Sequence, residues 1–228
     1  MKFFKYVLAF IFSVLVVSSY ANDLENYENE VLYKDGYIEL PKYMIEKSNL
    51  APDEILYFFD FNCVYCHSLH AYMETWADTL PDMFSLKYEP VIIDDPLYHL
   101  NAAAWIYISN SNLSIDMKNK YMTNIYKYLP RVSGPKKLTR LIKESFNDVG
   151  ADVKDFSQRF YLGEYDTVIK EKQERQRILN IQYTPSVVIG DKFLTHLGLA
   201  DGKAKEFITL LNAVTSYFIY QDREDANK

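Results

Sequence analysis

Two cysteines separated by two residues are the most reactive feature of this chain. Cys63 and Cys66 are the only cysteines among its 228 residues, and they lie in the segment Phe61-Asn62-Cys63-Val64-Tyr65-Cys66-His67. A disulfide across so short a loop stabilises a fold little, because it constrains little of the unfolded chain. The pair is therefore predicted to exchange disulfides with other thiols, with Cys63 as the nucleophile and Cys66 as the resolving thiol.

The same residues admit three other interpretations. The pattern Cys63-x-x-Cys66-His67 is also the attachment sequence of c-type haem. Cys63, Cys66, His67 and His70 supply four potential zinc ligands, although zinc sites usually draw on two separate segments of a chain. A purely structural disulfide between the two cysteines is the third alternative.

The elements around the cysteines favour the redox interpretation. The apolar and aromatic run from Ile55 to Phe61 predicts a buried strand. Residues 63–79 show helical spacing, so Cys63 should stand at a helix start, where free backbone N–H groups and the helix dipole favour a thiolate. We therefore expect a lowered pKa for Cys63 and a more buried Cys66. His67 and His70 follow the two cysteines by one turn, where either could tune a thiol or simply be exposed or cap the helix.

The remaining pattern predicts an α/β protein. Strands are expected at 37–40 and 86–93, helices between 96 and 163 and over 164–180, a hairpin around Gly190-Asp191, and a last helix over 200–220. The polar ends 22–35 and 221–228 are expected to be mobile or frayed. This order is that of a thioredoxin-like fold with an inserted all-helical domain.

Two segments carry a family resemblance. Residues 57–80 and the run Tyr183-Thr184-Pro185-Ser186-Val187-Val188-Ile189-Gly190 resemble the DsbA-like family of bacterial periplasmic disulfide oxidoreductases. The resemblance implies that Pro185 is a cis-proline opposite the cysteines and that Thr184 contacts substrate. The expected organisation is a signal peptide (1–21), the first half of a thioredoxin-like domain (22–94), an inserted helical domain (95–165) and the second half (166–228).

The chain also departs from that family. Val64-Tyr65 stands where DsbA carries Pro-His, while Tyr65 and Thr184 are shared with the isomerases DsbC and DsbG. Those isomerases dimerise through a separate N-terminal domain that residues 22–62 are too few to supply, so we expect a monomer. Tyr57 occupies the position at which the family commonly has a buried carboxylate, and Asp60 and Glu54 are out of register with it.

Export fits the same interpretation. A basic start, an apolar run over 6–17 and small residues at Ser19 and Ala21 predict a cleaved secretory signal, and hence a periplasmic protein. The net charge of −6 argues against a nucleic-acid partner. We expect a disulfide donor to cysteine-containing exported proteins that needs no cofactor or metal, with isomerase or reductase as the alternatives. The resemblance implies a quinone-linked membrane partner that reoxidises it.

Overall fold

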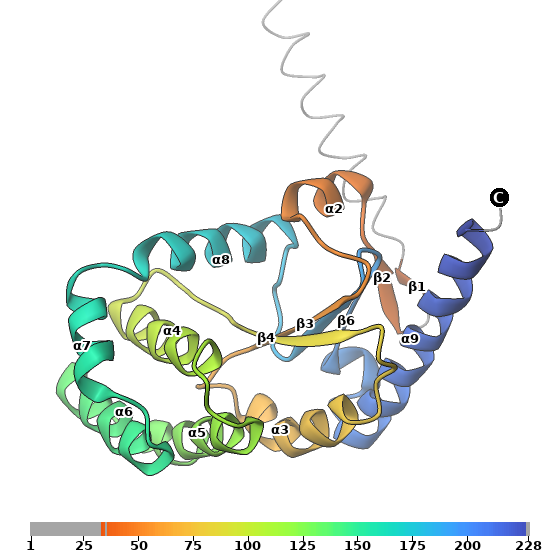
Figure 1. The fold of residues 1–228 in the computed structure, drawn as a ribbon. Helices are drawn as coiled ribbons and strands as arrows, with labels where there is room; N and C mark the ends of the chain where they lie inside the picture. Colours follow the sequence, from red (N-terminus) through yellow and green to blue (C-terminus); the bar gives the residue numbers. More distant parts are fainter. Residues whose placement is uncertain (1–32, 35, 227–228) are drawn as a thin grey trace, which may run out of the picture.

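The computed structural model describes residues 33–34 and 36–226, so the predicted signal peptide lies outside the described residues (Figure 1). The elements follow in the order β1 (Tyr33–Lys34), β2 (Tyr37–Glu39), α2 (Lys42–Ser48), β3 (Glu54–Phe59), α3 (Val64–Ala77), β4 (Ser85–Pro90), α4 (Pro96–Ser109), α5 (Ile115–Tyr128), η1 (Leu129–Arg131), α6 (Pro135–Val149), α7 (Val153–Tyr161), α8 (Asp166–Ile178), β5 (Ser186–Ile189), β6 (Phe193–His196), η2 (Leu197–Ala200) and α9 (Ala204–Ala226).

The described strands form one mixed sheet in the order β1-β2-β6-β5-β3-β4. β3 pairs in parallel with β4 and antiparallel with β5, and β5 pairs antiparallel with β6 across the predicted hairpin. β3 therefore lies inside the sheet, which agrees with the apolar character of its sequence on both faces.

Helices cover both faces of the sheet (Figure 1). Because side chains alternate along a strand, Ile55, Tyr57 and Phe59 of β3 face one way and Leu56 and Phe58 the other. The first set belongs to the large core that includes residues of α3 and α9, and the second packs with residues of α2, β6 and the C-terminal end of α8. The sheet thus holds the segment before Cys63 rigidly between two apolar layers.

The helices α4 to α7 follow β4 in the sequence and lie together at one end of the sheet (Figure 1). Local signals fix their ends: the Asp95 carboxylate caps α4 by accepting from the N–H of Leu97, and Gly150 ends α6 with a left-handed conformation. Their inner faces join the same core as α3, largely through aromatic rings such as Tyr121 and Phe146, whose centroids are 5.7 Å apart.

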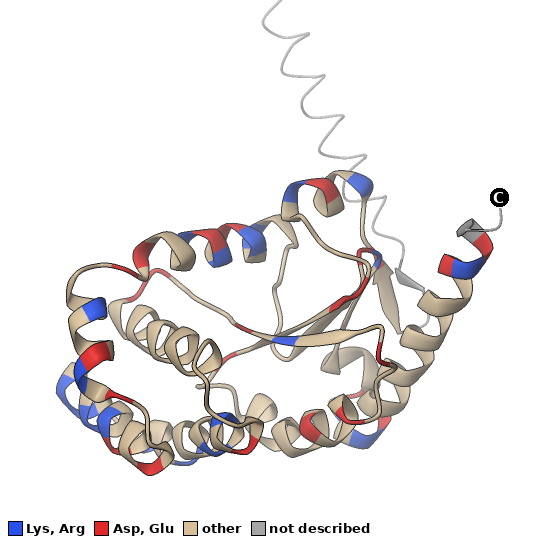
Figure 2. Cartoon of the chain, in the orientation of Figure 1, with Lys and Arg blue, Asp and Glu red and all other residues tan. Residues whose placement is uncertain are grey.

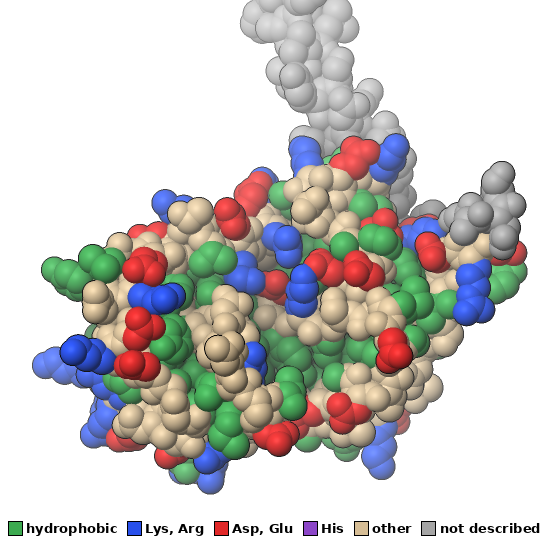
Figure 3. Space-filling model, viewed as in Figure 1, with side chains coloured by type: hydrophobic (Ala, Val, Ile, Leu, Met, Phe, Trp, Pro, Cys, Tyr) green, Lys and Arg blue, Asp and Glu red, His purple; other side chains and the backbone are tan. Residues whose placement is uncertain are grey.

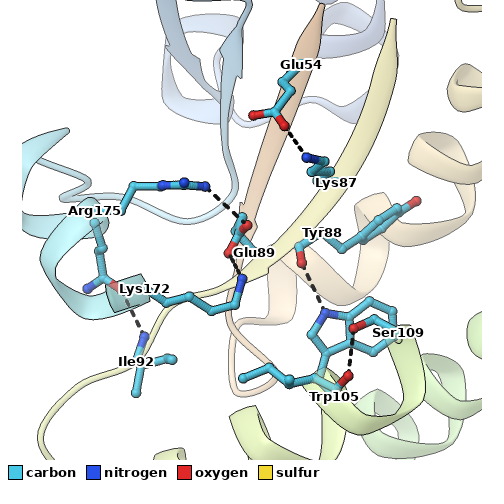
Figure 4. A network of polar contacts seen from close by, with 11 residues as sticks. Glu54, Lys87, Tyr88, Glu89, Ile92, Trp105, Ser109, Lys172 and Arg175 are labelled. Carbon is cyan, nitrogen blue, oxygen red and sulfur yellow. Dashed lines mark hydrogen bonds and ion pairs between the residues drawn. The ribbon is translucent and has the colours of Figure 1, made fainter. Parts of the chain in front are cut away.

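Polar contacts hold the helices α8 and α4 against the strand β4 (Figure 4). The buried carboxylate of Glu89 in β4 lies 2.5 Å from Lys172 Nζ and 3.8 Å from Arg175 Nη1, both of α8. On the other side of β4, Trp105 Nε1 of α4 donates to the carbonyl of Tyr88 over 3.1 Å. Both helices are therefore anchored to β4, the strand that precedes the helices α4 to α7 in the sequence.

Two local predictions were wrong, and one short helix was missed. Tyr33–Lys34, placed in the polar N-terminal segment, pairs with β2 as a short strand. The short helix α2 was not predicted, and α9 continues to Ala226 instead of fraying after Tyr220. Among the described residues no helix has the length and apolarity to cross a membrane. Acidic and basic residues are interspersed along the helices in Figure 2, and their side chains are mixed over the face shown in Figure 3.

Candidate active site

Cys63 is the N-cap of α3. Its backbone is extended, with φ −83° and ψ 115°, and its Sγ accepts from the backbone N–H of Cys66 over 3.2 Å. The pKa of Cys63 falls to about 6, first because the Cys66 side chain donates a hydrogen bond to it; partial burial opposes this effect, and Thr184 and the N–H groups of Tyr65 and Cys66 add to it. Near neutral pH, Cys63 is therefore largely a thiolate, the form that attacks disulfides.

Cys66 lies one turn further into the helix and has the opposite character. Its side chain is fully buried, and burial, followed by the hydrogen bond to Cys63, raises the pKa of its thiol. Both cysteines are free thiols in this structure. The two cysteines therefore differ: Cys63 is an accessible thiolate, and Cys66 is a buried, protonated thiol.

The loop before β5 closes over Cys63. The Thr184–Pro185 peptide bond is cis, and the Cys63 thiol lies 3.4 Å from the carbonyl oxygen of Thr184, to which it can donate. Pro185 is buried, and its carbonyl accepts from the N–H of Leu197 over 3.2 Å. Two segments more than 100 residues apart in the chain thus meet at the cysteine pair.

Exposed apolar side chains adjoin the cysteine pair and Thr184 in the sequence. Val64 and Tyr65 are 71% and 56% exposed, and Tyr183, next to Thr184, is 58% exposed. The Tyr183 ring packs on His196 of β6 with a centroid distance of 4.8 Å. Exposed apolar groups near a thiolate can bind an unfolded or extended polypeptide.

The two histidines after the cysteines have different surroundings. His67 is exposed and stacks on Tyr126 of α5, with centroids 5.4 Å apart and planes 9° from parallel. His70 is buried, so the prediction of an exposed or capping residue was wrong for it. Burial lowers the pKa of His70 to about 4, and its Nε2 lies 3.2 Å from Oε1 of Glu74. At neutral pH, His70 is an uncharged imidazole.

A set of buried hydroxyl groups lies beneath the cysteines. The Tyr57 and Tyr126 hydroxyls are buried and make no well-aligned hydrogen bond within the described residues, although Tyr57 interacts with the Cys66 side chain. Burial first, and then the proximity of Cys66, raise the pKa of Tyr57 well above its usual value. The sequence analysis singled out Tyr57, because it stands where the DsbA-like family commonly has a buried carboxylate. Tyr126 belongs to α5, and no sequence signal placed it near the cysteines.

Asp60, the carboxylate nearest in sequence to the cysteines, interacts with the segment just before Cys63 and with Tyr98 of α4. Asp60 Oδ1 accepts from the N–H of Asn62 over 2.8 Å, and its Oδ2 lies 3.4 Å from the Tyr98 hydroxyl. Burial raises the pKa of Asp60. Glu54, the other carboxylate out of register, instead pairs with Lys87 across β3 and β4 (Figure 4). Within the described part of the chain, no three His, Cys, Asp or Glu side chains gather as a metal site.

Comparison with known proteins defines the fold. No protein-family profile and no curated protein sequence matches the chain. Solved structures do: a DsbA1 oxidoreductase of N. meningitidis superposes with a TM-score of 0.65 at 17% identity, over 84% of this chain and 96% of that one. This chain has the DsbA-type fold. The DsbA of Pseudomonas aeruginosa (TM-score 0.64, 15% identity, 86% and 97% covered) and that of Klebsiella pneumoniae (0.63, 14%, 83% and 97%) agree. The predicted fold class, a thioredoxin-like fold with an inserted helical domain, is confirmed.

Proposed function

We propose that this protein is a thiol–disulfide oxidoreductase that works through Cys63 and Cys66. As a disulfide donor, its oxidised form would be attacked at Cys63 Sγ by a substrate thiolate, and Cys66 would leave with the electron pair of the broken disulfide. A second substrate thiolate would then attack the substrate sulfur of the mixed disulfide and release Cys63 as a thiolate. The substrate gains a disulfide, and the protein is reduced to the dithiol.

One observation carries this proposal. The Cys63 sulfur is half-buried at the start of α3, accepts from the Cys66 N–H over 3.2 Å, and lies 3.4 Å from the Thr184 carbonyl oxygen. A thiolate that accepts from the Cys66 N–H is a good leaving group in the last step, which favours the reduced protein and therefore disulfide donation. The fully buried Cys66 sulfur is protected from attack by large thiols.

The substrates we propose are cysteines of other exported proteins. The rings of Tyr65 and Tyr183, neighbours in sequence of Cys66 and Thr184, are exposed, and the Thr184 carbonyl lies beside the Cys63 sulfur. The DsbA of Proteus mirabilis, with a TM-score of 0.62 and 15% identity, has been solved with a non-covalently bound peptide PWATCDS, which contains a cysteine. By the same resemblance we propose export through residues 1–21, a periplasmic monomer, and reoxidation by a quinone-linked membrane protein.

Single-turnover oxidation of a reduced dithiol peptide tests the proposal. The oxidised wild-type protein should convert one equivalent of peptide to its disulfide. Cys66→Ser, reduced and given oxidised glutathione, should form a stable mixed disulfide at Cys63 and release one glutathione. Cys63→Ser should do neither. A wild-type protein that leaves the peptide reduced would contradict the function, while disulfide scrambling in a misoxidised peptide would favour the isomerase alternative. An absorption band in the Soret region would point to c-type haem at Cys63-x-x-Cys66-His67.

A further inference from the structure

Three ionisable side chains form a row along one side of α3. Cys66, His70 and Glu74 follow each other at intervals of four residues, so each lies one helical turn from the next on the same face. Their burial decreases along the row. Cys66 and His70 are buried, whereas the Glu74 side chain is 30% exposed. The row therefore runs from the interior beneath the active site to solvent.

The buried members of the row are set among polar atoms without well-aligned partners. Neither ring nitrogen of His70 has a well-aligned hydrogen bond in the described part of the chain, although Nε2 approaches Glu74 Oε1 to 3.2 Å and the Asn119 backbone interacts with the ring. The Tyr57 and Tyr126 hydroxyls, also buried and without well-aligned hydrogen bonds, adjoin Cys66, and the Tyr126 ring lies 5.6 Å from that of His70. A neutral imidazole buried without good hydrogen bonds is destabilising, so a role beyond packing needs to be considered.

The proposed exchange reaction gives the row a role. Whenever Cys66 attacks a mixed disulfide it must lose a proton, and whenever it leaves as a thiolate it must gain one. The thiol is sealed from water by its burial, and burial makes its deprotonation unfavourable. We propose that His70 and Glu74 carry the proton between Cys66 and solvent. This inference rests on the proposed function.

The relay balances in both directions. As the Cys66 sulfur attacks Cys63 Sγ, its proton passes to one nitrogen of the neutral His70 ring, one helical turn along α3. The ring gives the proton on Nε2 to the Glu74 carboxylate, which releases it to water. The new bond is Cys63–Cys66, and the electron pair of the broken bond leaves with the departing thiolate. Donation to a substrate runs the same steps backwards.

Other groups around the row set its pH range. His70 faces Tyr88 of β4 and the Tyr126 ring and Asn119 backbone of α5, with His67 on its own helix. Burial, with Asp116 of α5 and Asp78 at the C-cap of α3, raises the pKa of Glu74. Because neutral His70 is the relaying form, the relay should work throughout the range from about pH 5 to 8.

Oxidised glutathione is a suitable probe, because its reaction with the reduced protein separates the two cysteines. Cys63 attacks first and becomes glutathionylated, and Cys66 then displaces glutathione. Acid quenching and mass spectrometry measure both steps. In His70→Gln the first step should stay within twofold of wild type, and the second should slow about tenfold or more, since positioned proton transfer contributes roughly 10²- to 10⁴-fold. The rate of the second step in His70→Gln should also rise about tenfold per pH unit, more steeply than in wild type.

Matched variants separate a relay from a structural effect. Glu74→Gln, at a partly exposed position that should not impair folding, should slow the second step at least threefold. Asp82→Asn removes an exposed carboxylate beyond the end of α3 and should leave it unchanged. Added imidazole should restore the rate of His70→Ala. An unchanged second step in Glu74→Gln and His70→Gln, or an equal slowing in Asp82→Asn, would overturn the relay. A wild-type protein that oxidised glutathione neither glutathionylates nor converts to its disulfide would overturn the proposed function itself.

Discussion

Replacing Cys66 by alanine should make Cys63 a much weaker acid. The hydrogen bond from the Cys66 side chain is the largest cause of the lowered pKa of Cys63, ahead of the effects of Thr184 and of the backbone. Alanine removes this donor but leaves the N–H of residue 66, which donates to Cys63 Sγ over 3.2 Å. Serine keeps a side-chain hydroxyl in the same place and is the matched control.

The size of the effect follows from the kind of hydrogen bond. A hydrogen bond to a charged group contributes about 1.5–3 kcal/mol. Because a shift of one pH unit in a titration corresponds to 1.36 kcal/mol, the titration midpoint should move upward by about one to two pH units in Cys66→Ala. In Cys66→Ser it should move by less than about half a unit, because the hydroxyl still donates.

The titration is measured from the rate of alkylation of Cys63 by iodoacetamide between pH 4 and 10, since only the thiolate reacts. Thiolate absorbance provides a second readout on the same samples. Wild type should titrate near pH 6, the value to which the pKa of Cys63 falls. If Cys66→Ala and wild type titrate together, the backbone and the helix dipole hold the thiolate, and the Cys66 side chain is refuted as its main stabiliser.

Three further outcomes are expected. First, the reduced protein should gain stability with pH: the pKa of Cys63 falls on folding from 9.0 to about 6, so its contribution is fully present above about pH 9 and is lost as the pH falls through about 6. That pKa shift corresponds to about 4 kcal/mol, which screening of a half-exposed thiol reduces to about 2 kcal/mol. The contribution is measured as the difference in unfolding free energy between reduced wild type and Cys63→Ser, determined at pH 5 and at pH 9. Second, equilibration with glutathione should give a potential more negative than the roughly −120 mV of DsbA, because the pKa of Cys63 exceeds DsbA's roughly 3.5; a potential at or above −120 mV would mean that another group strengthens the thiolate. Third, Gly190→Ala should destabilise the fold by about 2–4 kcal/mol in urea, since φ is +56° and a Cβ would lie 2.3 Å from Phe218 Cε2, whereas Gly150→Ala, with φ +76° and open space, should lose only about 1 kcal/mol; equal losses would contradict the packing argument.

The sequence predicted the elements that hold the cysteines because their signals are local. The apolar run before Cys63 and the helical spacing after it fix a strand and a helix without reference to the rest of the chain. The turn at Gly190 likewise marked the hairpin before α9. The short helix α2 was not predicted because it has only seven residues and its N-cap residue, Pro41, makes no side-chain capping hydrogen bond. β1 has two residues, too few for a periodic pattern.

The surroundings of the cysteines could not be predicted in the same way. Spacing placed His70 on the Cys66 side of α3, but its burial depends on α5, which packs there from the inserted helices. Tyr126 reaches the same place through that packing and has no neighbour in sequence to indicate it. The assignment of roles to Cys63, Cys66, Thr184 and Pro185 stays a prediction that solution chemistry must test.

Alkylation of the reduced protein with less than one equivalent of iodoacetamide at pH 7, followed by peptide mapping, tests the central claim most directly. The thiolate at the start of α3 should take the label, so we expect Cys63 to be modified at least about tenfold more than the buried Cys66. Equal labelling of the two cysteines, or preferential labelling of Cys66, would contradict the assignment of Cys63 as the nucleophile.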